Sequence, residues 1–152
     1  RLWHERELLE MLLFKLEEQR LLLESGSMRW VQFATREVEQ VLDRQRASGL
    51  SRDVEVASAA REWGAPEAAT LSALIDVAPT DAWRDVLTEH RNALAALVAE
   101  GARLKGANEI HLRTAALAVE ETLTGFAAGT GEYTTHGERK RDDTARIVDR
   151  KM

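Results

Sequence analysis

Leucines recur along the first part of the chain in alternating steps of three and four residues. Because an α-helix turns once every 3.6 residues, side chains at this spacing share one face. The pattern predicts a helix from about Leu2 to Glu24 that packs on other helices along one seam. The seam consists of Leu9, Leu12, Leu16 and Leu23, with Gln19 filling one slot.

The same spacing returns in the next segment, which predicts a second helix from about Met28 to Ala47, closed by Ser48 and Gly49. The short break at residues 25–27, Ser-Gly-Ser, favours two antiparallel helices, since glycine suits a helix C-terminus. One long helix kinked at Ser27 is the alternative. The second seam consists of Val31, Ala34, Val38 and Val41.

The middle of the chain predicts short helices, and its end predicts one long helix. Short helices are expected over residues 51–63 and 66–78, the second with Pro66 in its first turn. Thr80 or Asp81 caps a last helix over residues 82–127. From Gly129 the apolar pattern stops, and we expect residues 130–152 to form a flexible C-terminal tail. The expected fold is therefore all-α: an antiparallel helical bundle or coiled coil over residues 1–129, with long N- and C-terminal helices and short middle ones.

Composition narrows the class of protein. The chain has no cysteine, which excludes disulfides, thiolate metal sites and a cysteine nucleophile. The net charge of -5 is spread along the chain, so a nucleic-acid partner is not expected. The longest apolar run, from Met11 to Phe14, is too short to span a bilayer, and no signal peptide is visible. We therefore expect a cytoplasmic protein without membrane insertion.

The motifs of catalytic and metal sites are also missing. No Glu-x-x-His, His-Glu-x-x-His or phosphate-binding glycine motif occurs. His111 reads as a histidine at the boundary of the core, and Glu120 and Glu121 point about 100° apart on a helix, which does not suit paired acid–base chemistry. We predict no catalytic residue, no metal ligand and no cofactor. A binding protein is expected, and an enzyme with an unusual site is the lesser alternative.

The last helix carries the functional argument. Between Asn108 and Phe126 its apolar residues occupy more than one stripe, with Ile110, Leu117, Ala118 and Phe126 roughly on one side and Leu112, Val119 and Leu123 off it. A helix of this kind either lies centrally in its own bundle or meets a helix of a partner. Tyr133, the only tyrosine, follows this region and either folds back on the bundle or enters a pocket of a partner.

Three parts of the sequence together resemble the FlgN family of flagellar export chaperones. The first is the opening helix pair from Leu8 to Arg46, with its glycine-containing break. The second is the middle segment TLSALI, Thr70 to Ile75. The third is the long helix with NEIHLRTAALAVEETL, Asn108 to Leu123, followed by YTTHG, Tyr133 to Gly137, which resembles the family's Asn-containing helix and Tyr-x-x-x-Gly ending.

The resemblance implies a cytoplasmic chaperone for the hook–filament junction proteins. Such a chaperone holds the terminal helix of its client, prevents premature self-association and delivers the client to the flagellar type III export gate. On this pattern Tyr133 lies in the gate-docking element, and the client surface is on the last helix, at Leu112, Ala116, Val119, Leu123 and Phe126. The alternatives are a regulatory module that homodimerises weakly through the same helix, and a chaperone for filament cap or flagellin.

Overall fold

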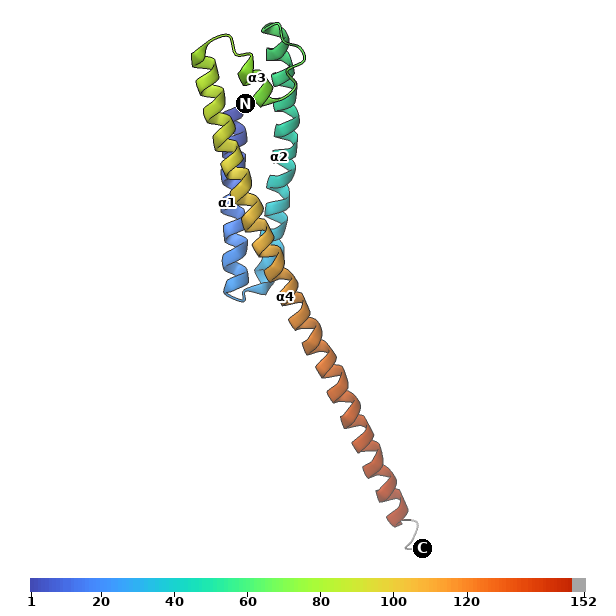
Figure 1. The fold of residues 1–152 in the computed structure, drawn as a ribbon. Helices are drawn as coiled ribbons and strands as arrows, with labels where there is room; N and C mark the ends of the chain where they lie inside the picture. The colour runs from blue at the N-terminus through green and yellow to red at the C-terminus, as the bar shows by residue number, and fades with distance from the viewer. Residues whose placement is uncertain (149–152) are drawn as a thin grey trace. The chain divides into compact units, whose positions relative to one another are not determined.

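The chain forms four helices and, over the residues described, no strand, which confirms the all-α prediction. The computed structural model describes the backbone of residues 1–148 and the side chains of residues 1–128. The helices are α1 (Leu2–Glu24), α2 (Met28–Glu62), α3 (Leu71–Asp76) and α4 (Asp81–Val148) (Figure 1). They divide into two units, residues 1–110 and residues 111–152, so that α4 contributes to both.

Helices α1 and α2 are separate, and they lie antiparallel, as their sequence break predicted (Figure 1). Gly26 takes a positive φ of 71°, which costs glycine little because it has no Cβ. Its N–H donates to the carbonyl of Leu23 at 3.2 Å, and the N–H of Ser27 donates to that of Leu22 at 3.0 Å. These two bonds satisfy the last carbonyls of α1 in a Schellman turn. The alternative of one kinked helix is wrong.

The predicted end of the second helix at Ser48 and Gly49 is wrong, because α2 continues to Glu62. A glycine inside a helix costs about 1 kcal/mol relative to alanine, which burial further along the helix can offset. Beyond Gly49, Val56 and Ala60 are buried, and Arg52 pairs with the buried Glu5 of α1. The separate helix expected over residues 51–63 is therefore the second half of α2.

The helix expected from Pro66 is also wrong, since α3 begins only at Leu71. The hydroxyl of Thr70 accepts a hydrogen bond from the N–H of Ala73 at 3.1 Å and caps the helix there. Pro66 lies in the preceding turn, which places Ala65 and Ala68 in the core. At the start of α4 the predicted cap is confirmed, because the Thr80 hydroxyl accepts from the N–H of Trp83 at 3.3 Å.

Residues 1–110 enclose two adjoining apolar clusters. Both predicted seams are confirmed, because all of their positions are buried except Leu23, which is half-buried. The first cluster joins α1, α2 and α4 through Leu9, Leu12, Leu16, Val38, Val41, Leu94 and Leu104. The second joins the end of α2, α3 and the start of α4 through Val56, Ala60, Ala65, Ala68, Leu74, Ile75 and Leu87.

The second unit consists of the rest of α4, and its backbone stays helical to Val148, beyond the end predicted near Ala127. The side chains from Gly129 onward and all of residues 149–152 lie outside the described part, so the flexible tail at residues 130–152 remains a prediction. Within the part described, no helix is long and apolar enough to cross a membrane.

Candidate partner-binding surfaces

The residues predicted to hold a client form one stripe along the second unit. Counting from Leu112, the steps are four, three, four and three residues, which keep all five side chains on one helix face. Leu112 is half-buried and Ala116 is exposed. Val119, Leu123 and Phe126 are 56%, 65% and 73% exposed. We call Leu112, Ala116, Val119, Leu123 and Phe126 the α4 stripe.

The opposite side of the same helix also carries an exposed apolar residue. Leu117 is 56% exposed, as Val119 is, and the two lie about 160° apart around the helix axis at 100° per residue. The apolar character on two sides that the sequence indicated is therefore present. The expected position of Phe126 on the side of Leu117 is wrong, because Phe126 lies seven residues from Val119 and shares the face of the α4 stripe. The side chain of Tyr133 lies outside the described residues, so its predicted role is not tested.

A second apolar surface, which we call the hairpin groove, lies where α1 meets α2. It has a volume of about 360 Å³ and is lined by Leu21, Leu22, Trp30, Phe33 and Ala34, with Glu18 and Glu37. Lys15 donates to both carboxylates at 2.8 Å, and these hydrogen bonds raise the pKa of Lys15. The guanidinium groups of Arg29 and Arg36 lie over the rings of Trp30 and Phe33 at 4.3 and 5.5 Å. Cations already occupy positions on both rings.

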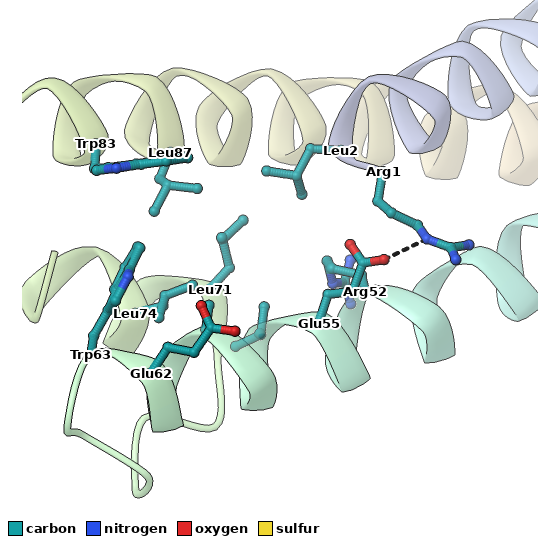
Figure 2. Close-up of a pocket in the computed structure, with 12 residues that line it drawn as sticks. Arg1, Leu2, Arg52, Glu55, Glu62, Trp63, Leu71, Leu74, Trp83 and Leu87 are labelled. Carbon is teal, nitrogen blue, oxygen red and sulfur yellow. Dashed lines mark hydrogen bonds and ion pairs between the residues drawn. The ribbon is translucent and has the colours of Figure 1, made fainter.

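A third surface, which we call the tryptophan pocket, lies at the other end of the first unit (Figure 2). Its volume is about 260 Å³. Trp63 directly follows the last residue of α2 and Trp83 lies in the first turn of α4, and their ring centroids are 5.9 Å apart. Leu71 and Leu74 of α3 and Leu87 of α4 form further walls. The sequence did not indicate this pocket, because its two tryptophans lie at the ends of different helices.

A buried polar network joins the three long helices of the first unit. Asn108 of α4 donates from Nδ2 to the carbonyl of Leu16 at 2.8 Å and to Oε1 of Gln19 at 3.0 Å. Gln19 in turn donates to the hydroxyl of Thr35 on α2 at 2.9 Å. Each buried polar group thus meets a partner on another helix, which fixes one alignment of the three helices.

The start of α1 holds a buried carboxyl group that the sequence analysis missed. Glu5 is 3% exposed. Its Oε1 accepts from Arg52 at 2.6 Å and from Gln45 at 3.3 Å, whereas Oε2 has no partner. Burial raises the pKa of Glu5, Arg52 opposes this shift, and Asp53 adds to it. The group supports α2 beyond Gly49 and has no access to a substrate.

The family assignment rests on most of the chain. The model of the FlgN protein family matches residues 1–141. The chain belongs to the FlgN family. FlgN proteins are flagellar export chaperones, as the resemblance had indicated, and the family is not known for enzymatic activity. No curated protein and no solved structure matches this FlgN chain. Over its described residues, no group of three or more histidine, aspartate or glutamate side chains is placed to hold a metal ion.

Proposed function

We propose that this FlgN protein is a cytoplasmic chaperone that holds the terminal helix of a hook–filament junction protein on the α4 stripe. It thereby prevents premature self-association of the client and delivers it to the flagellar type III export gate. The observation that carries the proposal is the stripe itself, in which Val119, Leu123 and Phe126 are each more than half exposed on one helix face.

The stripe has the chemistry that an amphipathic helix needs for pairing. Alternating four- and three-residue steps are the spacing at which two helices interlock their side chains. Small side chains within and beside the stripe, at Ala116 and Ala115, allow a close approach of a second backbone. A client helix that buries its own apolar face here also covers the chaperone's, so both partners lose apolar surface to water.

Delivery requires release, and the proposal includes a separate gate-docking element around Tyr133. An aromatic side chain on a terminal segment can enter a pocket of the export gate without occupying the client surface. Because a client segment orders on binding, its ordering entropy offsets part of the contact energy and keeps the complex reversible.

The first test is a pull-down with the junction proteins of the same flagellar system, each full-length and without its terminal helix. We expect full-length clients to bind and truncated ones to be lost. Val119→Asp and Leu123→Asp should remove binding, because each places a charge where the client's apolar face lies. Leu117→Asp is the matched control: it adds the same charge at equal exposure on the opposite side of the helix, and binding should persist.

Binding that survives both stripe substitutions in a folded protein would reject the client surface. A well-folded monomer that binds none of the clients would reject the junction-protein function. A dimer that Leu123→Asp dissociates would favour the regulatory module. The gate-docking role of Tyr133 is tested by a chain truncated before Gly131, which should bind its client but fail to support its export. Normal export of the client with that chain would exclude a gate-docking role for Tyr133.

A further inference from the structure

We infer that the tryptophan pocket is a second docking surface, which takes an apolar or aromatic anchor residue from a basic segment of a partner protein. This inference goes beyond the proposed function, because the pocket lies within residues 1–110 and contains no residue of the α4 stripe. Three observations carry it: an open apolar cavity, an exposed tryptophan on its wall, and the charge of the surrounding segments.

The cavity is large enough to hold a side chain. An engineered apolar cavity of about 150 Å³ binds benzene, and the tryptophan pocket measures about 260 Å³. Figure 2 shows Trp83 and Leu87 facing Trp63 and Leu71 across it. Trp83 is 51% exposed, although it lies beside a core cluster that could have covered it. A single leucine or phenylalanine side chain would bury both indole rings further.

The segments that build the pocket carry the protein's excess negative charge. Residues 50–89 hold eight carboxylates and three arginines, a net of -5 that equals the net charge of the whole chain. The remaining residues are therefore balanced in formal charge. A surface with this excess attracts cationic partners and slows the approach of acidic ones.

Part of this charge is not neutralised within the protein. Glu62 lines the pocket and forms no ion pair with any described residue, whereas Glu55 on the same rim pairs with Arg1 at 2.6 Å. Glu67, Asp76 and Asp85, on the segments that build the pocket, are likewise exposed and unpaired within the described part. The two arginines that line the pocket are already paired, Arg1 with Glu55 and Arg52 with Glu5 and Asp53. Arg61, the neighbour of Glu62 in sequence, forms no ion pair with a described residue, but it is one cation against four unpaired carboxylates.

The hairpin groove differs from the tryptophan pocket in its charges, and this difference indicates why a basic partner should prefer the pocket. Its two carboxylates are bridged by Lys15, and arginines lie over its aromatic rings. The tryptophan pocket has an acidic rim residue without a counterion and no described cation stacked on its rings. A cation next to an apolar anchor would there gain both an ion pair and contact with an indole face.

The experiment measures binding of a defined probe to the full chain by fluorescence anisotropy. The probe is a fluorescein-labelled helical peptide of lysine and alanine with one central phenylalanine. Two matched peptides carry alanine in place of phenylalanine, or glutamate in place of lysine. We expect the first peptide to bind at least about ten-fold more tightly than either of the others.

Trp83→Ala should weaken binding of the probe about ten-fold, and Glu62→Lys should weaken it further at low salt. Trp30→Ala is the matched control, because Trp30 is exposed to a similar degree but lines the hairpin groove. Equal losses in Trp83→Ala and Trp30→Ala, or none in either, would overturn the inference. Equal binding of the lysine and glutamate peptides would also overturn it. So would a protein that does not bind the probe but self-associates with rising concentration, if Trp83→Ala abolishes that self-association.

Discussion

Asn108 Nδ2 lies 3.0 Å from Oε1 of Gln19, and both side chains are buried between α4 and α1. The two residues are 89 positions apart in sequence, so the bond forms only when the helices reach their final alignment. Slipping α4 along α1 by one turn would separate Asn108 Nδ2 from both of its acceptors, the Leu16 carbonyl and Gln19 Oε1. An apolar seam alone tolerates such a slip more easily, because one leucine can replace another.

We predict that Asn108→Ala destabilises the first unit by about 1–3 kcal/mol, because Gln19 keeps a buried amide that has lost its donor. Urea unfolding followed by circular dichroism measures this change. Asn92→Ala makes the same substitution at an exposed position of α4 and should shift stability by less than about 0.5 kcal/mol. Equal effects of the two substitutions would show that the network adds nothing to stability.

The buried Glu5 should make the unfolding free energy of the protein depend on pH in a direction that its pKa shift determines. Burial raises the pKa of Glu5 in the folded state, so the folded protein holds this proton more tightly than the unfolded chain. The contribution of Glu5 to stability therefore falls as pH rises, from about 4.3, the ordinary pKa of glutamate, through the folded value. The unfolding free energy of wild type minus that of Glu5→Gln should decrease over this range.

The control for this prediction is Glu10→Gln, which changes an exposed carboxyl group of the same helix. The difference in unfolding free energy between wild type and Glu10→Gln should not change with pH over this range. A wild-type advantage that grows with pH would mean that the ion pair with Arg52 outweighs the cost of burial. The Glu5→Gln variant should also retain its helical content at all pH values tested, because Arg52 is partly exposed and water can solvate it when the Glu5 carboxylate is absent.

The side chain of Thr70 should stabilise α3, the short helix that lines the tryptophan pocket. Its hydroxyl accepts from the N–H of Ala73 at 3.1 Å, and loss of such a cap costs about 0.5–2 kcal/mol. Thr70→Ala should lower the thermal midpoint, whereas Thr70→Asp keeps an acceptor and should restore most of the loss. If Thr70→Asp is as unstable as Thr70→Ala, the cap is not the source of the effect.

The sequence predicted the buried faces of the helices better than the bounds of the middle helices. The buried seams of α1 and α2 were predicted correctly, because apolar residues spaced three and four apart over several turns indicate the buried face of an α-helix. Gly49 was misread as a stop, since glycine ends a helix only where the following residues gain nothing by continuing it. Here Val56 and Ala60 are buried in the second cluster, and that contact is not visible in the local sequence.

Polar groups and pockets depended on contacts between distant segments. Gln19 was recognised only as a gap in a leucine seam, and its partner Asn108 could not be assigned from spacing. Trp63 and Trp83 meet because the chain turns twice between them. The spacing of the α4 stripe, by contrast, lies within one helix and is visible in the sequence; its role in binding a client stays a prediction.

Two glycines give opposite predictions for the same substitution. Gly106 lies inside α4 with nothing within 4 Å of the position of an added Cβ. Gly106→Ala should therefore stabilise the protein by up to about 1 kcal/mol through helix propensity alone. Gly26 has equal space but a φ of 71°, and Gly26→Ala should destabilise it by about 1–2 kcal/mol. Thermal unfolding of both variants separates the causes: a loss of stability in each would mean that added volume, and not backbone conformation, decides the outcome at these sites.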